Sequence, residues 1–221
     1  MHRYVSRVSV LTLSTLPLLV ISTLAVSLVS VSAASAQDRM PPIPPEKYDA
    51  AQKKAADNFQ VARKGPVFGP FSVLMRSPDL MTANRIFGDY LRLKPSIGNK
   101  LSELIILTTA REWTQDYEWY VHAPIALKQG ITQEIIDAIA EGRRPPGMNE
   151  DQEICYDFTT ELIRNKRVSD ATYDRALKRF GEIGVLDISG IGGYYTLLAM
   201  EMNTTRMPIP ANGKHLRRFP E

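Results

Sequence analysis

The sequence contains almost no cysteine: Cys155 is the only one in 221 residues. A single cysteine cannot form an internal disulfide, and it cannot supply both the attacking and the resolving thiol of a thiol peroxidase. Cys155 lies among apolar neighbours in a helical stretch, with Glu153 and Asp157 close by. Acidic neighbours disfavour a thiolate, so we expect a buried core cysteine rather than a reactive one.

Other absences exclude further classes of function. The three histidines are not paired with each other or with a cysteine cluster in a zinc-ligand spacing. No G-x-S-x-G element of a serine hydrolase is present, and the G-x-G-G run at 190–193 follows no strand and precedes no lysine, unlike a phosphate loop. We therefore expect those glycines to allow close helix packing, and we expect no cofactor. A single-histidine metal site with Glu103 and Glu118 remains an alternative.

The N-terminus has the features of a secretory signal peptide. Arg3 and Arg7 precede an apolar run from 8 to 31, and the small residues 34–36 predict cleavage after Ala36. An uncleaved membrane anchor is the rival interpretation, since the run is long enough to span a bilayer. We predict a periplasmic or secreted protein of 185 residues without stable membrane association.

Cleavage also removes the apparent basic character of the chain. The segment carries two arginines and no acidic residue, so the net charge falls from +3 to +1. A charge this small gives no reason to expect nucleic-acid binding.

The remaining chain predicts one all-α domain, because no useful run alternates apolar and polar residues. We expect a proline-rich arm at 37–45, about seven helices within 46–210, and a C-terminal tail at 211–221. Ser77 before Pro78, Asn99 or Ser102, and Thr132 are the candidate helix starts, and Gly130 is a candidate helix end. The other predicted helices cover about 45–63, 149–165, 169–181 and 184–202.

The segment from Glu103 to His122 carries the most informative spacing. Gln115, Glu118 and His122 are separated by three and four residues, which places them on one face of a helix. Glu103 lies on a preceding apolar helix that can fold back across a short turn. A histidine between two carboxylates suits proton transfer near neutral pH. A surface histidine in a helical ion pair is the alternative, and Glu103 could merely stabilise its helix start.

Arginine and aromatic residues supply candidates for substrate binding. An arginine can grip a carboxylate with two parallel hydrogen bonds, and Arg111, at the end of the Glu103 helix, is the first candidate. Arg76, Arg85 and Arg92 are further candidates, each with a surface ion pair as the alternative. Gln115 lies on the same helix face as His122. Aromatic residues could wall a pocket or fill the core: these are Trp113, Trp119, Tyr120, Tyr194 and Tyr195.

The same segment resembles the carboxymuconolactone decarboxylase family of the alkylhydroperoxidase-D-like superfamily. The peroxidase branch carries E-x11-C-x2-C-x3-H, and here the frame reads Glu103, Gln115, Glu118 and His122, without either cysteine. SELIILTTAR and YEWYVHAPIAL resemble the cysteine-free branch. The likeness extends from GPFSVLMRSPDL to MPIP, and so covers nearly all of the chain after about residue 45.

This resemblance implies an alkylhydroperoxidase-D-like helical fold and a cofactor-free decarboxylase, or a related lyase or isomerase, of aromatic-compound catabolism. Its substrate would be a small carboxylated lactone, with His122 as proton donor and Glu118 and Glu103 supporting it. The resemblance also implies a homotrimer or homohexamer. The alternatives are a peroxidase-like antioxidant protein, which the missing cysteine pair disfavours, and a non-catalytic exported binding protein.

Overall fold

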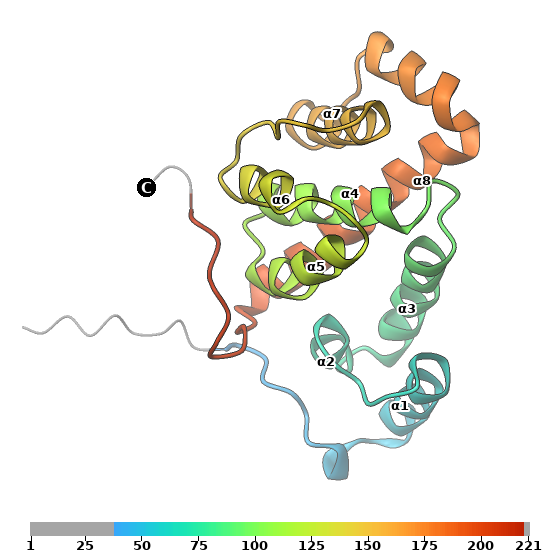
Figure 1. Cartoon of the computed structure of the whole chain (residues 1–221). Helices are drawn as coiled ribbons and strands as arrows, with labels where there is room; N and C mark the ends of the chain where they lie inside the picture. The colour runs from blue at the N-terminus through green and yellow to red at the C-terminus, as the bar shows by residue number, and fades with distance from the viewer. Residues whose placement is uncertain (1–37, 219–221) are drawn as a thin grey trace, which may run out of the picture. The chain divides into compact units, whose positions relative to one another are not determined.

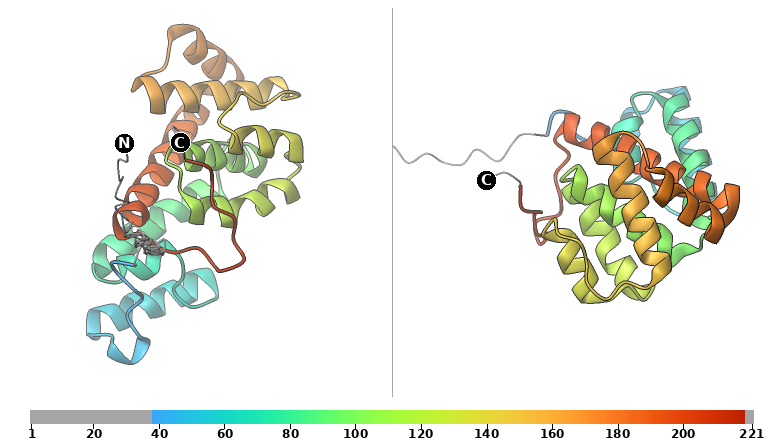
Figure 2. Two further views of the ribbon diagram at one scale, coloured as in Figure 1. Left: turned by 90° about the vertical axis from the view of Figure 1, so that its left-hand side faces the viewer. Right: turned by 90° about the horizontal axis from the view of Figure 1, so that it is seen from above.

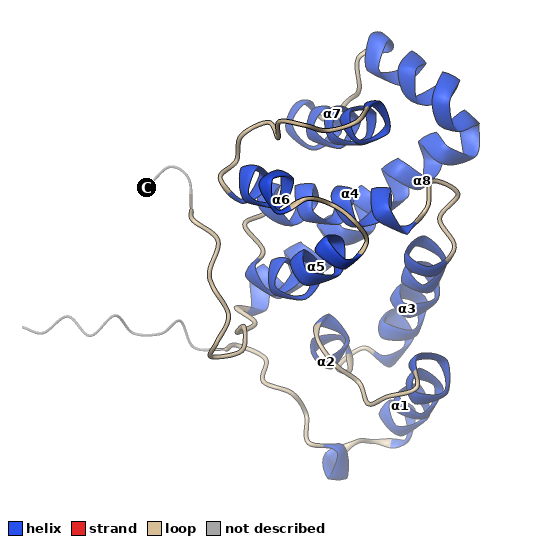
Figure 3. Ribbon diagram, viewed as in Figure 1, coloured by secondary structure: helices blue, strands red, loops and turns tan. Residues whose placement is uncertain are grey.

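The computed structural model describes residues 38–218, and all regular structure in that range is helical (Figures 1 and 3). The all-α prediction is confirmed for this part of the chain, with eight α-helices rather than about seven. The predicted signal peptide, residues 1–36, lies outside the described residues. The helices are α1 (Ala50–Arg63), α2 (Pro70–Leu74), α3 (Pro78–Leu93), α4 (Asn99–Glu112), α5 (Asp116–Lys128), α6 (Gln133–Ala140), α7 (Glu150–Asn165) and α8 (Asp170–Thr205), and Pro45–Lys47 forms a 3-10 turn.

Most helix starts follow the local sequence signals, but the start of α4 does not. The Thr132 side chain caps α6 as predicted, and α5 begins at Asp116. Gly98 occupies the N-cap position of α4, so Asn99 and Ser102 lie inside the helix and the predicted capping by either is wrong. The chain enters α4 with a φ of 82° at Gly98, which a glycine adopts without steric cost.

Helix α2 is too short for the sequence periodicity to reveal. It follows Gly69, which has a φ of 57°. A side chain at this position would also meet the Tyr117 ring, whose hydroxyl would lie 2.9 Å from an added Cβ. Both constraints favour glycine, and the turn brings the start of α2 against α5.

The predicted helices 169–181 and 184–202 form one element, α8, with a break in helical geometry at Gly181, whose φ is 67°. The expected close packing at the later glycines is confirmed at Gly190, where an added Cβ would lie 3.1 Å from Leu91 of α3. The expectation is wrong for Gly193, where an added Cβ would meet no atom within 4 Å.

Helix α4 is the centre of the domain. Every residue from 101 to 111 is buried, because α5, α6, α7 and α8 all pack around it. Figure 2 shows α8 passing alongside α4 and α7. A helix that is buried on all sides must also bury its polar residues, and Glu103 is one of them. Cys155 of α7 is fully buried in the same core, as predicted.

A second apolar cluster joins α1, α2 and α3, around Phe59, Phe71 and Met81. Of the helices in the described range, α8 alone has the length and apolar composition to cross a membrane. However, 56% of its most apolar window is buried inside the domain, as is typical of a core helix.

The described parts of the arm and the tail are tied to helix ends. Arg39 donates its backbone N–H to the carbonyl of Thr205 at the end of α8. Asp116, the first residue of α5, accepts hydrogen bonds from the Leu216 backbone and from Nδ1 of His215. The tail therefore crosses the start of the helix that carries His122.

Candidate active site

The structure brings Glu103, Glu118 and His122 together in the interior. Glu103 projects from the central helix α4, and Glu118 and His122 lie one turn apart on α5. Nδ1 of His122 lies 2.7 Å from Oε2 of Glu103, and Nε2 lies 3.3 Å from Oε2 of Glu118. The side chains of all three are at most 6% exposed, so the alternative of a solvated surface ion pair is wrong.

The two carboxylates set the charge state of the imidazole. Burial on its own lowers the pKa of His122, because it disfavours a charged ring. The hydrogen bonds and negative charges of Glu103 and Glu118 oppose this effect and outweigh it, so the pKa is raised above the ordinary value of 6.5. We therefore expect an imidazolium held between two carboxylates at neutral pH.

The start of α5 fixes the orientation of this cluster. The Gln115 side chain accepts the backbone N–H of Tyr117 at 2.6 Å and that of Glu118 at 3.3 Å. Its amide nitrogen donates to Asn203 of α8 at 3.0 Å. Gln115 thus caps the helix and attaches it to α8, which is a structural task.

A narrow pocket reaches Glu118 and His122 from α1, α2, α3 and α8. Its free interior volume is about 30 Å³, close to the share of one water molecule in the liquid, so a larger guest must displace lining side chains. Oε1 of Glu118 is buried and has no hydrogen-bond partner among the described residues. The pocket is lined by Arg63, Phe68, Pro70, Phe71, Gly88, Arg92, Tyr117, Glu118, Val121, His122, Tyr194 and Tyr195.

None of the four residues first chosen from the sequence for substrate binding, Gln115 among them, lines this pocket. Arg85 pairs with Asp89 at 2.6 Å, and Trp119 packs against the main core. Arg111 donates to the carbonyl of Ala140, the last residue of α6, and to the Thr114 hydroxyl. Arg111 lies instead in a second pocket of about 370 Å³ on another part of the domain.

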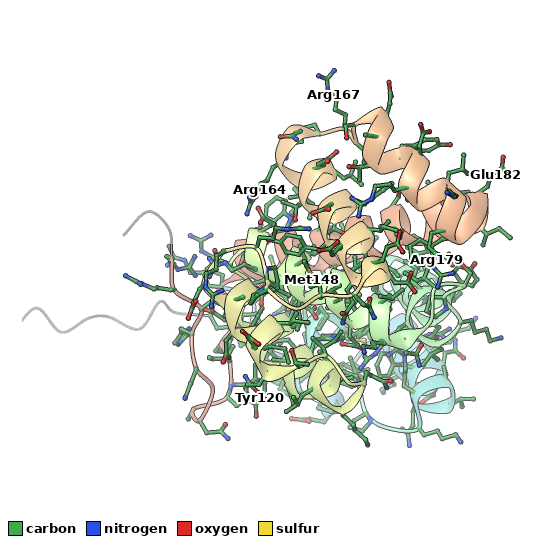
Figure 4. The ribbon with its side chains drawn as sticks, turned by 45° about the horizontal axis from the view of Figure 1, so that its top comes forward. Tyr120, Met148, Arg164, Arg167, Arg179 and Glu182 are labelled. Carbon is green, nitrogen blue, oxygen red and sulfur yellow. The ribbon has the colours of Figure 1, made fainter. Side chains whose placement is uncertain are left out.

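That second pocket offers no comparable chemistry. Arg164, whose position on α7 is labelled in Figure 4, binds Glu112 through two hydrogen bonds of 2.9 and 2.6 Å. Its remaining lining residues are Thr114, Glu141 and Gly142, together with Arg111. The charged groups of this pocket are thus engaged: Arg164 pairs with Glu112, Glu141 pairs with Arg143, and Arg111 makes the hydrogen bonds described above.

Several pocket residues were not among the sequence candidates. Tyr117, Arg63 and Phe71 are recruited by the packing of α1 and α2 onto α5, which local spacing does not encode. Gly69 and Gly88 were the available signals, since each sits where a Cβ would collide with a tyrosine of the pocket. A glycine inside helix α3 costs about 1 kcal/mol against alanine, which indicates a close approach.

The ligand geometry does not favour a metal at His122. Each ring nitrogen already faces a carboxylate oxygen at 2.7 or 3.3 Å, so neither lone pair is directed toward an open position. Within residues 38–218, no group of three or more histidine, cysteine or acidic side chains has an arrangement suited to a metal ion.

The only thiol is also outside the site. Burial, with a contribution from Asp151, raises the pKa of Cys155 far above its usual value. Cys155 does not line either pocket. A buried thiol that stays protonated is a poor nucleophile toward a peroxide.

Comparison with known proteins places the fold and part of the chain in a family. Residues 78–150 match the model of the carboxymuconolactone decarboxylase family. Comparison with curated proteins gives no significant match.

Three solved structures share the fold at low sequence identity. The alkylhydroperoxidase AhpD core protein of Ralstonia eutropha JMP134, described as peroxidase-related, is 17% identical, with a TM-score of 0.64 over 78% of this chain and 92% of that one. A variant of the debrominase Bmp8, in complex with 2,3,4-tribromopyrrole, is 13% identical, with a TM-score of 0.63 over 80% and 94%. A peroxidase-related protein of Silicibacter sp. TM1040 is 15% identical, with a TM-score of 0.62 over 78% and 90%.

These similarities agree with the all-helical structure of the described residues. Identities of 13–17% establish the fold and leave the reaction open. Residues 78–150 thus match the carboxymuconolactone decarboxylase family, and the described residues share the helical fold of the alkylhydroperoxidase AhpD core.

Proposed function

We propose that this protein is a cofactor-free acid–base enzyme, a decarboxylase or a related lyase or isomerase, that acts on a small conjugated organic acid such as a carboxylated lactone. The observation that supports it best is the buried Glu103–His122–Glu118 cluster at the end of a pocket. A histidine whose pKa is raised by two neighbouring carboxylates holds its second proton to higher pH and is suited to give it to a carbanionic or enolate intermediate.

The proposed step needs no metal or organic cofactor when the substrate is itself conjugated. The bond between the substrate and its carboxyl carbon breaks, CO2 leaves, and the bonding electrons delocalise into the adjacent unsaturated carbonyl as an enolate. His122 then delivers a proton to carbon and becomes neutral, and it is recharged from solvent. In an isomerase, a base such as Glu118 would remove a proton from one carbon to form the enolate, and His122 would then protonate another carbon without loss of CO2.

The two glutamates have different tasks in this proposal. Glu103 lies on the far nitrogen and does not line the pocket, so it orients the ring and favours its charged form. Glu118 lies at the pocket, and its unpaired Oε1 can accept a hydrogen bond from a substrate hydroxyl or a water. Removal of either glutamate should therefore impair the reaction less than removal of His122.

The rival reading as a thiol peroxidase has no support from the site. The positions of the two cysteines are occupied by Gln115 and Glu118, and Cys155 is buried in the core. Relatives of the same fold include peroxidase-related proteins and a debrominase, so the fold itself does not select among reactions.

A substrate panel tests the proposal. The purified protein would be incubated in D2O with carboxymuconolactone and a set of small unsaturated carboxylic acids and lactones. Proton NMR would follow both the loss of carboxyl groups and deuterium incorporation at carbon. We expect at least one compound to react with wild-type protein and to react much more slowly with His122→Gln. If the variant reacts as fast as wild type, the proton donor lies elsewhere.

We also propose that the protein works as an exported homo-oligomer, a trimer or hexamer. Exposed apolar side chains on α3 and α8 support an oligomer, because large apolar patches usually mark interfaces; they are Ile86, Phe87, Tyr90, Leu93, Ile183, Leu186, Leu197 and Met200. Light scattering at micromolar concentration would contradict this if it gave the mass of a monomer.

A further inference from the structure

Arg92 stands out among the arginines near the pocket. It lies in the last turn of α3, is half-buried, and lines the pocket together with Glu118 and His122. Within the described range, it has no hydrogen bond and no ion pair to another side chain. An arginine that is partly removed from water without a counterion is costly unless a ligand supplies one.

The other arginines of this region are already engaged. Arg63 also lines the pocket, but its guanidinium lies 2.6 Å from Asp89. Arg85 binds the same Asp89 at 2.6 Å. Of the two pocket arginines, Arg63 is thus ion-paired through Nε, and Arg92 has no ion pair among the described residues.

Two tyrosine side chains line the same pocket as Arg92. Tyr194 and Tyr195 line the pocket, and neither hydroxyl makes a hydrogen bond within residues 38–218. Burial is the largest effect that raises the pKa of each phenol, so both are neutral hydrogen-bond donors at physiological pH. The Tyr195 ring also meets the His122 ring edge-on, with centroids 5.1 Å apart.

Arg92 and the Tyr194 hydroxyl are related through one face of helix α3. An added Cβ at Gly88 would collide with that hydroxyl, so the phenol lies against the Gly88 face of α3. Arg92 is four residues further along, on the same face, and helical side chains lean toward the N-terminus of their helix. Arg92 and Gly88 therefore share the face of α3 that Tyr194 contacts, and all three residues line the pocket.

The net charge of the Glu103–His122–Glu118 cluster explains why a cation is useful in this pocket. An imidazolium between two carboxylates carries one net negative charge, which repels an anion that enters the pocket. Arg92 lies on the opposite helix and compensates that charge, and its field reaches Tyr195 next to the His122 ring. A bound carboxylate can thus be attracted to one wall while its carbon chain points toward His122.

We propose that Arg92 and the Tyr194 hydroxyl form the carboxylate-binding subsite of this pocket, so that its ligands are small planar organic anions. This inference rests on the acid–base function proposed above for the same pocket. The arrangement replaces Arg111 and Arg85, the first choices from the sequence, with an arginine that lines the same pocket as His122.

Binding can be measured without turnover. Sorbate, a conjugated monocarboxylate, would be titrated into full-length folded protein by NMR and by calorimetry, with neutral sorbamide as the matched uncharged probe. Arg92→Gln should weaken sorbate binding about 10-fold to 100-fold, because charge-assisted hydrogen bonds are lost. Tyr194→Phe should weaken it by about 2-fold to 10-fold. Sorbamide binding should change little in either variant.

Lys94→Gln is the matched control. Lys94 is an exposed cation at the C-cap of the same helix and does not line the pocket. Its removal should leave sorbate affinity within about twofold of wild type, and Arg92→Lys should restore part of the affinity that Arg92→Gln loses.

Several outcomes would contradict the proposed carboxylate-binding subsite. These are failure of wild-type protein to bind sorbate at millimolar concentration, equal binding by Arg92→Gln, or equal losses in the Arg92 and Lys94 variants. If Arg92 only stabilises the end of helix α3, Arg92→Gln should lower the melting temperature and leave sorbate affinity unchanged. If sorbate binding depends on Arg92 but no compound in the D2O panel reacts, the subsite stands and the proposed reaction fails. If a compound reacts and Arg92→Gln changes neither KM nor affinity, the subsite fails and the reaction stands.

Discussion

Two histidine–carboxylate pairs in this molecule have the same length and different surroundings. Nδ1 of His122 lies 2.7 Å from Glu103, and Nδ1 of His215 lies 2.7 Å from Asp116. The His122 side chain is 3% exposed, whereas that of His215 is 73% exposed. Distance alone therefore does not distinguish a candidate site from a surface ion pair.

Two further features separate the pairs. His122 has a second carboxylate, Glu118, on its other nitrogen, and it lies in the wall of a pocket. His215 lies on the C-terminal tail, where water screens its interaction with Asp116. Burial, a two-sided charge environment and access to a pocket, taken together, are what make His122 a candidate for proton transfer.

The largest expected difference is in turnover. His122→Gln should reduce the rate on a substrate found in the D2O panel by about 10²-fold to 10⁴-fold, the usual contribution of a positioned acid or base. His215→Gln, which breaks the exposed pair, should leave the rate within about twofold. Both rates would be measured on samples with matched melting temperatures. Equal losses in the two variants would remove the distinction between the pairs.

The second-largest expected difference is in the coupling energy between the two partners of each histidine–carboxylate pair. A double-mutant cycle on Glu103 and His122, using glutamine at both positions, should give a coupling of about 1.5–3 kcal/mol in unfolding free energy, as for buried hydrogen bonds to charged groups. The same cycle on Asp116 and His215 should give about 0–1 kcal/mol, as for exposed ion pairs. Chemical denaturation supplies the free energies. A larger coupling for the exposed pair would contradict this ranking.

The pH dependence of stability provides a smaller effect with a defined sign. Because the pKa of His122 is raised in the folded state, its stabilising contribution is complete below pH 6.5 and is lost as the pH rises through the folded pKa. Burial raises the pKa of Glu201 to about 7, and this also makes stability fall as the pH rises toward that value. Denaturation of Glu201→Gln protein from pH 6 upward isolates the His122 contribution. Adding His122→Gln should flatten the remaining decline, and an unchanged curve would contradict the raised pKa.

A Cys155 variant tests whether burial alone makes a side chain important for turnover. Cys155 is fully buried, as the His122 cluster is, but it lies outside the pocket, so Cys155→Ala should change turnover less than tenfold. The rate would be compared with that of wild type at equal folded concentration. A larger loss would support thiol chemistry in place of the acid–base proposal.

The sequence predicted the parts of this site that depend on local spacing. Glu118 and His122 are four residues apart on one helix, and Glu103 lies on a helix that only a short turn separates from it. These distances along the chain leave few ways to arrange the three side chains. The family frame pointed to the same positions.

The opposite wall of the pocket could not be read from spacing. Arg92, Tyr117 and Tyr194 meet through the packing of α3, α5 and α8, which are far apart in the sequence. Arg111 was preferred because it shares a helix with Glu103, but eight residues of an α-helix cover more than two turns and carry it to another pocket. Gly88, which gives Tyr194 its room, was the one local sign of this contact.

The most direct test of the central claim is the protonation state of His122 itself. In protein labelled with 15N-histidine, the His122 ring signals can be identified by their absence from His122→Gln and then titrated by NMR. We predict that both ring nitrogens carry protons at pH 7, that the pKa lies above 6.5, and that it falls in Glu103→Gln and Glu118→Gln. A His122 ring that is already neutral at pH 6.5 would contradict the account, because the single N–H of a neutral imidazole is far too weak an acid to protonate the intermediate.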